Sequence, residues 1–363
     1  MHTPQTETAV AEIIKGAGGP LAIAGGGTRG IAVAGDALSV AGLREVTLYE
    51  PGAMTMVAQA GTPVSEIEAT LAAENQRLAF EPMDARVLMG TDGTPTIGGV
   101  MAANASGPRR ISVGAARDFL LGVRFVDGAG AVVKNGGRVM KNVTGYDLVK
   151  LMSGAHGTLG VLTEVSFKTL PRPETQATLL LHGLSDAQAV QAMSRALGSP
   201  FETSGAVHDP AAGVTALRVE GFEASVAYRI QSLTERLGAR EVSTLDAEET
   251  TQRWAAWRDV HGFAQDGDDV WRVSCKPSDG PALAAKSGAE GVFYDWGGGL
   301  LWLRTAAGHD LRAALGRYDG HATLVRGNAH PRFEPEAAGV AALSKGLRAR
   351  FDPRGILNAG LMG

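Results

Sequence analysis

The stretch Gly25-Gly-Gly-Thr-Arg-Gly30 directly follows a short apolar run, residues 20–24, that predicts a buried strand. Glycine carries a high conformational-entropy cost, so a run of three suggests a tight turn or a close approach of backbone to a ligand. Successive backbone N–H groups in such a loop can form a concave binding site for an anion. A plain turn explains the run equally well, so this loop alone does not decide between the two.

Three further glycine-containing segments favour a ligand. Glycine accounts for 49 of the 363 residues, nearly twice the usual share, and the clusters lie in the first 160 residues. Thr96-Ile-Gly-Gly opens a predicted helix over residues 96–104, whose free N–H groups would suit a phosphate. Asn104-Ala-Ser-Gly107 adds short polar side chains, and Gly157-Thr-Leu-Gly160 lets backbone reach a flat ring. Together they predict a large dinucleotide.

Two common nucleotide-binding motifs do not fit the first loop. A nicotinamide-binding Rossmann motif needs a helix after its last glycine, but Ile-Ala-Val-Ala-Gly-Asp follows Gly30. A phosphate-binding Walker loop needs Gly-Lys-Ser/Thr, which is absent from this position.

Composition limits the classes of protein to which the chain can belong. Hydrophobic residues make up 44% and charged residues 20%, and the net charge of -4 gives no general attraction to nucleic acid or acidic lipid. A single cysteine, Cys275, excludes an internal disulfide framework or a cysteine-ligated iron–sulfur cluster. Neither a signal peptide nor a run long enough to cross a bilayer is visible, so we expect a cytoplasmic location.

The pattern of elements predicts an α+β fold with three parts. Residues 1–174 combine glycine-rich loops with strands, a hairpin at 119–134 and a helix at 146–152. In residues 175–335 glycine is less frequent, and strands alternate with amphipathic helices. This pattern predicts a smaller antiparallel α+β cap domain. Residues 336–363 predict a helix and a tail that returns to the first domain.

The glycine-rich segments, with Lys141-Asn-Val-Thr-Gly-Tyr-Asp147 and Phe351-Asp-Pro-Arg-Gly-Ile-Leu-Asn358, resemble the FAD-binding domain of the p-cresol methylhydroxylase (PCMH) / vanillyl-alcohol oxidase superfamily. Within it, the sequence most resembles the FAD-binding E subunits of bacterial glycolate oxidase. Ala359 stands where that family usually has proline. The resemblance implies a two-part PCMH-type FAD domain.

The resemblance also implies roles for individual residues. The diphosphate would be held by Gly25, Gly26, Gly27, Thr28 and Arg29. The ribityl chain and flavin would be lined by Thr96, Gly98, Gly99, Asn104, Ser106 and Gly107. The adenine half would meet Gly157, Thr158, Gly160 and Val161, and Asn358 would return to the flavin edge. The first loop lacks the histidine or cysteine with which some relatives anchor flavin, so we expect noncovalent FAD.

Oxidation of a 2-hydroxy acid needs a cation for the carboxylate and a base for the hydroxyl proton. The candidate base is His321, and the candidate cations, each next to or near a tryptophan, are Arg258, Arg272 and Arg304. A structural histidine and surface arginines explain the same residues. His321 and His330 lack the helical spacing of a metal site, so we expect no metal.

Two functional hypotheses follow. In the first, the chain is a FAD-dependent subunit of a glycolate oxidase complex that takes part in oxidising glycolate or a related 2-hydroxy acid. The resemblance then implies a D-type flavin subunit and an iron–sulfur F subunit as partners, and leaves open a peripheral attachment to the inner membrane through the complex. In the second, the chain is a non-catalytic assembly subunit with a vestigial flavin site.

Overall fold

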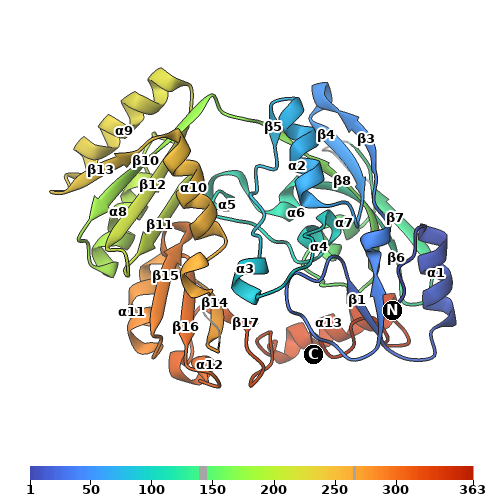
Figure 1. Ribbon diagram of the computed structural model, residues 1–363. Coiled ribbons are helices and arrows are strands. Elements are labelled where there is room, and N and C mark those ends of the chain that lie inside the picture. The colour runs from blue at the N-terminus through green and yellow to red at the C-terminus, as the bar shows by residue number, and fades with distance from the viewer. Residues whose placement is uncertain (139–144, 265–266, 363) are drawn as a thin grey trace.

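The computed structural model describes residues 1–138, 145–264 and 267–362 and has two lobes that lie side by side (Figure 1). We call residues 1–174 the first lobe and residues 175–335 the second lobe. Part of the quoted stretch Lys141–Asp147, namely residues 141–144, lies outside the described residues.

The first lobe is built on a five-stranded antiparallel sheet. Its strands, in spatial order, are β3 (Val46–Glu50), β4 (Thr55–Gln59), β8 (Val161–Lys168), β6 (Leu120–Val126) and β7 (Val132–Gly136). Two small pairs accompany it: parallel β1 (Leu21–Ala24) and β2 (Asp36–Ser39), and antiparallel β5 (Gln76–Arg77) and β9 (Leu170–Pro171). The helices of this lobe are α1 (Glu7–Gly16), α2 (Val64–Ala73), α3 (Arg86–Met89), α4 (Ile97–Ala102), α5 (Arg110–Val113), α6 (Ala116–Phe119) and α7 (Leu148–Met152).

Capping residues set where some of these helices begin. The Asp147 side chain accepts a hydrogen bond from the Lys150 N–H, so α7 begins at Leu148 rather than at Tyr146 as expected. The Thr96 hydroxyl caps α4 in the same way by accepting from the Gly99 N–H. Helix α4 is thereby fixed at the start of the segment that the glycine pattern had singled out.

The second lobe is an eight-stranded antiparallel sheet with helices against it. The strand order is β13 (Val242–Leu245), β10 (Thr175–His182), β12 (Val214–Gly221), β11 (Gly205–Asp209), β15 (Gly291–Asp295), β16 (Leu300–Thr305), β14 (Asp269–Cys275) and β17 (Gly320–Arg326). Its helices are α8 (Asp186–Leu197), α9 (Glu223–Leu237), α10 (Ala247–Arg258), α11 (Gly280–Lys286) and α12 (Leu311–Leu315). The expected antiparallel α+β arrangement of this part is confirmed.

Short 3₁₀ helices occur at Val40–Gly42, Pro51–Ala53, His261–Phe263, Pro277–Asp279 and Trp296–Gly298.

The C-terminal segment returns to the first lobe. Helix α13 (Ala338–Phe351) runs beneath that lobe in Figure 1. After it, the Leu21 N–H donates to the Ile356 carbonyl at 2.7 Å, and the Asn358 N–H donates to the Leu21 carbonyl at 3.0 Å. The tail therefore lies alongside β1, the strand that leads into the Gly25–Gly30 loop.

A buried ion network joins the two lobes. Glu81 of the first lobe accepts hydrogen bonds at 2.9 and 3.0 Å from Arg218, whose side chain is 1% exposed. Glu220 of the second lobe accepts from Arg109 at 2.9 Å and from Arg77 at 2.6 Å. Burial alone would raise the pKa of Glu81, but the charges of Arg218 and Arg109 outweigh it and lower that pKa to about 2. Both carboxylates are thus ionised between guanidinium groups.

We predict that Glu81→Gln lowers the free energy of unfolding by about 3–5 kcal/mol, because it leaves a buried guanidinium without its full counter-charge. Urea denaturation measures the change. Glu202→Gln is the matched control, since Glu202 also has a positive φ and pairs with an arginine, but its side chain is 85% exposed. The control should change stability by no more than about 0.5 kcal/mol. Equal effects of the two substitutions on stability would contradict the assignment of Glu81 to a buried ion network.

The same network predicts a loss of stability in acid. The folded pKa of Glu81 lies below its ordinary value of 4.5, so the stabilisation is complete above that value. It should be lost as the pH falls from about 4.5 towards 2, which thermal unfolding at a series of pH values would show. In Glu81→Gln this part of the pH dependence should shrink, and an unchanged profile would argue against the network.

Candidate functional site

Two adjoining cavities lie along the predicted FAD segments. The smaller, of about 180 Å³, is within the first lobe, and the larger, of about 900 Å³, lies between the lobes and is lined by residues of both. Five residues line both cavities: Arg29, Ile31, Met83, Ala103 and His156. The two spaces are therefore parts of one elongated site that starts at the glycine loop and ends against the second lobe.

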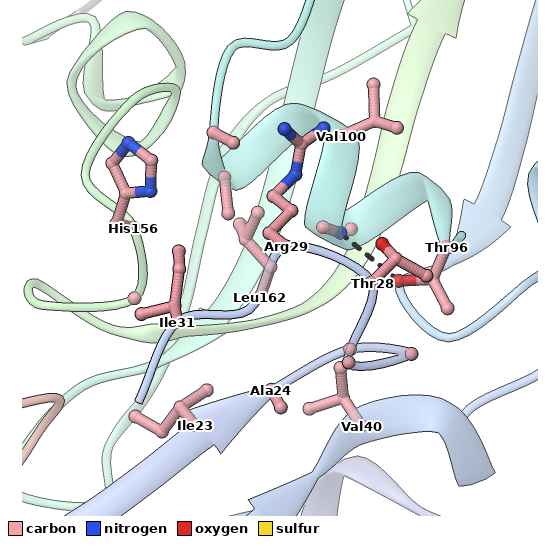
Figure 2. Close-up of a pocket in the computed structure, with 18 of the residues that line it drawn as sticks. Ile23, Ala24, Thr28, Arg29, Ile31, Val40, Thr96, Val100, His156 and Leu162 are labelled. Carbon is pink, nitrogen blue, oxygen red and sulfur yellow. Dashed lines mark hydrogen bonds between the residues drawn. The ribbon is translucent and has the colours of Figure 1, made fainter. Parts of the chain in front are cut away.

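The Gly25–Gly30 loop is held through its carbonyl groups. The Ser39 hydroxyl donates to the Gly25 carbonyl and the Thr91 hydroxyl donates to the Thr28 carbonyl, each at 3.1 Å. The backbone N–H groups of Gly26, Gly27 and Thr28 have no acceptor within the described part of the chain. Figure 2 shows this loop between β1, which carries Ile23 and Ala24, and the start of α4 at Thr96. Adjacent unused donors of this kind suit a phosphate oxygen.

The glycines of the site serve two different purposes. A Cβ atom on Gly26 would lie 1.6 Å from the Thr94 carbonyl oxygen, and one on Gly98 would lie 2.7 Å from the Ala60 carbonyl oxygen. These two residues are glycine because the backbone packs closely. Gly27 has φ +72° and no atom within 4 Å of a Cβ position, so its conformation, not lack of space, requires glycine.

The expectation that α4 offers free N–H groups to a phosphate is wrong. The N–H groups of Ile97, Gly98 and Gly99 donate to the Thr62 carbonyl, the Ala60 carbonyl and the Thr96 hydroxyl. Thr96, Gly98 and Gly99 still line the smaller cavity, so they shape its wall.

Asn358 connects the C-terminal tail to both glycine-rich loops. Its side-chain oxygen accepts from the Ile23 N–H at 2.7 Å, and its amide nitrogen donates to the His156 carbonyl at 2.8 Å. The side chain is buried and lines the smaller cavity beside Gly157. Its hydrogen-bonding groups therefore fix β1 relative to the loop at His156, a positioning role that the resemblance did not imply.

His156 and Arg29 give the shared part of the site its electrostatic character. Burial, together with the charges of Arg29 and Arg332, lowers the pKa of His156 to about 4, so its ring is neutral at pH 7. Burial and the charge of Arg332 lower the pKa of Arg29 to about 10, which leaves it charged. The His156 ring packs against Phe333 at a centroid distance of 4.9 Å. Figure 2 shows Arg29 and His156 on separate loops.

The structure places most of the predicted cofactor residues along these cavities. The smaller cavity is lined by Gly25, Gly26, Gly27, Thr28, Arg29, Thr96, Gly98, Gly99, Gly157, Gly160, Val161 and Asn358. The larger is lined by Asn104 and Ser106. Gly107 and Thr158 line neither cavity. The Gly107 carbonyl accepts from the Trp296 indole at the lobe boundary, and the Thr158 hydroxyl donates to the Ala155 carbonyl.

Two of the four predicted catalytic residues reach the site. Arg272 and His321 both line the larger cavity, from the neighbouring strands β14 and β17. Arg258 and Arg304 line neither cavity. Arg258 donates to Asp259 at 2.7 and 2.8 Å, and Arg304 donates to Asp268 at 3.0 Å, so each already faces a carboxylate.

Sequence reasoning missed several residues of the larger cavity: Arg110, His156, Trp296, Arg332 and Phe333. Two of them lay close to segments already singled out, since Arg110 comes three residues after Gly107 and His156 precedes Gly157. Trp296 and Arg332 lie far away in the chain and reach the cavity only through the packing of the lobes. Among the described residues, no group of three or more His, Cys, Asp or Glu side chains is arranged to hold a metal ion.

Comparisons with known proteins identify the family. The FAD binding domain family model matches residues 1–136. Glycolate oxidase subunit GlcE from Escherichia coli is 35% identical over 350 residues, which cover 94% of this chain and 92% of that protein. The chain belongs to the GlcE family. Glycolate oxidase subunit GlcD from Bacillus subtilis is 44% identical over 85 residues, 23% of this chain and 18% of that protein.

The fold and cofactor expectations are confirmed by these comparisons. A solved alkyldihydroxyacetonephosphate synthase has a TM-score of 0.73 at 15% identity and covers 99% of this chain and 76% of its own. At that identity the likeness shows the fold alone, which is of the PCMH type. FAD is the cofactor of this GlcE-family chain, and the free donors of the glycine loop fit its diphosphate. No helix in the described residues is both long and apolar enough to cross a bilayer.

We predict that Gly99→Asp weakens FAD binding at least about tenfold. Gly99 is the third residue of α4, where an aspartate suits the helix, but a carboxylate there would extend into a site for an anionic cofactor. Gly99→Ala is the control, because its Cβ would meet only the Thr96 hydroxyl, at 3.2 Å. Flavin fluorescence titration of the apoproteins measures the affinities. Wild-type affinity in a folded Gly99→Asp protein would remove α4 from the site.

We predict that the purified chain releases intact FAD on acid denaturation, since no histidine or cysteine occurs in the Gly25–Gly30 loop. Absorbance of the supernatant after precipitation measures the release. Flavin that stays with the precipitate would contradict noncovalent binding and would make His156 the first candidate anchor, because it lines both cavities.

Proposed function

We propose that this chain is the FAD-binding subunit of a glycolate oxidase complex and takes part in oxidising glycolate or a related 2-hydroxy acid to the 2-oxo acid. The observation that carries the proposal is the meeting of Arg272 and His321 in the larger cavity. The proposed cation and base would thus lie together at the second-lobe end of the site, next to the predicted FAD segments. The similarity to a protein named glycolate oxidase subunit GlcE supports the choice of substrate.

When bound, FAD supplies the two-electron acceptor for this chemistry. The chain's own residues would hold the acid and move its proton. Arg272 remains charged at pH 7, although burial and the charge of Arg110 lower its pKa to about 10, so it can bind a carboxylate.

His321 would accept the hydroxyl proton. His321 is exposed towards the cavity, but partial desolvation and the charge of Arg272 lower its pKa, and Glu334 offsets this only in part, so the ring is neutral at pH 7 and can take up a proton. The same shift makes it a weaker base than an unperturbed imidazole. We therefore propose that proton abstraction is slow in this chain by itself.

The cofactor-binding roles of Gly25–Thr28 and Arg29 form part of the proposal. The unused N–H groups of Gly26 to Thr28 would bind the diphosphate, and the charge of Arg29 would balance it. Asn104 and Ser106, on the first-lobe side of the larger cavity, would then lie beside the flavin ring.

Electrons taken up by the chain would have to pass to another protein or a diffusing acceptor. The chain has one cysteine, Cys275, and an iron–sulfur cluster needs several thiolates. We propose a D-type flavin subunit and an iron–sulfur F subunit as partners. The similarity to a protein named glycolate oxidase subunit GlcD supports the first of these. A cytoplasmic location of this complex stays a prediction.

We predict that the isolated FAD-loaded chain oxidises glycolate slowly or not at all, and that the D-type subunit is needed for full activity. General-base catalysis typically contributes about 10²–10⁴-fold, and the base available here is weak. Anaerobic stopped-flow mixing with glycolate, followed by flavin absorbance with and without the partner, measures the reduction rate.

Two variants show whether the flavin reduction takes place at this site. Arg272→Met should abolish any flavin reduction by the complete complex that occurs at this site, whereas the ion-paired Arg304→Met should have a smaller effect. Fast single-turnover reduction in the chain alone would contradict the weak-base argument, and His321→Asn would then be the first variant to make.

A further inference from the structure

The larger cavity holds an excess of positive charge. Arg29, Arg110, Arg272 and Arg332 line it, and no side chain of the four has an ion pair or hydrogen bond within the described part of the chain. These four arginines are half-buried, and arginine side chains withdrawn from solvent are normally paired. The FAD diphosphate proposed above accounts for Arg29, which belongs to the glycine loop. The other cations need a different explanation.

Two of them are held on one tryptophan. The guanidinium carbons of Arg110 and Arg272 lie 4.6 and 4.8 Å from the Trp296 ring centroid. Arg110 comes from α5 of the first lobe, while Arg272 and Trp296 come from β14 and the turn after β15 in the second. The Trp296 indole also donates to the Gly107 carbonyl at 3.2 Å, which fixes the ring across the lobe boundary. We call these three residues the arginine clamp.

The clamp brings like charges together without a matching anion. Burial and the charge of Arg110 lower the pKa of Arg272, and the charge of Asp295 offsets this only in part. Stacking on an indole orients a guanidinium. The N–H donors, which point outward in the plane of the guanidinium, stay unused. An anion that bridges the two groups would use those donors and relieve the repulsion.

The carboxylates around the cavity are already engaged. Asp295 accepts from the Trp296 N–H at 2.6 Å, and burial raises its pKa to about 7, so it does not supply a full negative charge at pH 7. Glu334 accepts from the Ala322 N–H at 2.7 Å, and Glu336 accepts from the Ser344 hydroxyl at 2.8 Å. None of the three forms an ion pair with the clamp arginines.

We propose that the arginine clamp binds a doubly charged small acid, so that among 2-hydroxy acids this site prefers one with a second anionic group over glycolate. One guanidinium would hold the carboxylate next to the reacting carbon, and the other would hold the second group. This proposal rests on the proposed function for its chemistry. The second group is a carboxylate or a phosphate monoester, which share the charge and the acceptor oxygens that two guanidiniums recognise.

Binding of non-oxidisable anions to the FAD-loaded chain tests the clamp without turnover. The probes are malonate, methyl phosphate and acetate, added at constant ionic strength while the flavin absorbance spectrum and the melting temperature are followed. Malonate or methyl phosphate should bind at least about tenfold more tightly than acetate. Equal affinities for acetate and both dianions would overturn the proposal.

Arg110→Gln should remove the preference for the dianion and leave acetate binding and FAD content unchanged. Arg117→Gln is the matched control, because Arg117 lies nearby in the chain, is half exposed and lines neither cavity. Unchanged malonate and methyl phosphate binding in Arg110→Gln would overturn the proposal. Loss of FAD from a folded Arg110→Gln protein would also overturn it, since Arg110 would then serve the cofactor.

If Arg110→Gln does not fold, Arg110→Lys keeps the charge but lacks the planar pair of donors. Weaker dianion binding with normal acetate binding would support the clamp, and wild-type binding of both would overturn it. The proposed function can fail independently of the clamp. Should dianions bind as expected while no hydroxy acid reduces the flavin with the partner present, the clamp would stand as an anion site and the oxidation would be rejected.

Discussion

The buried ion network around Glu81 and Glu220 ties the two lobes together, and the larger cavity lies between the lobes that it joins. Glu81 is held between guanidiniums from both lobes, and Glu220 lies between Arg109 and Arg77. Charges buried in this way stabilise a structure weakly when compared with apolar packing, but losing one partner is costly. The network therefore acts mainly by penalising any other arrangement of the lobes. Arg272 and His321 of the second lobe line the larger cavity in this arrangement.

Within the first lobe, a second constraint shapes the cofactor site. The tail residue Asn358 bonds to both β1 and the loop at His156, and Ser39 and Thr91 bond to carbonyl groups of the glycine loop. These contacts consume acceptors of the loop and leave its N–H donors free. A loop arranged in this way presents positive partial charge before any ligand arrives, which lowers the cost of ordering on binding.

Local patterns were sufficient to predict the strand before the glycine loop, the hairpin at 119–134 and the helices at 96–104 and 146–152, because each depends on neighbours in the chain. Thr96 could be recognised as a helix start for the same reason. What local patterns could not show was that Ala60 and Thr62 would take the N–H groups of α4, since these partners come from a distant strand end. Glycine content likewise could not distinguish two reasons for glycine. Gly26 must be glycine because a side chain would clash with the Thr94 carbonyl, and Gly27 must be glycine because of its positive φ.

Residues contributed across the lobe boundary were the hardest to foresee. Arg272 and His321 came from a general requirement for a cation and a base, which Arg258 and Arg304 satisfied equally well in the sequence. Only the folded structure shows that Arg258 pairs with Asp259 and Arg304 with Asp268. Trp296 carries no local sign that it will support arginines from two lobes.

The central claim is that FAD lies with its diphosphate on the glycine loop and its flavin ring in the cavity between the lobes. A crystal structure of the FAD-loaded chain tests this most directly. The account predicts phosphate oxygens within hydrogen-bonding distance of the Gly26, Gly27 and Thr28 N–H groups, and the flavin ring facing Arg272 and His321. A diphosphate bound elsewhere, or a ring directed away from the second lobe, would contradict it.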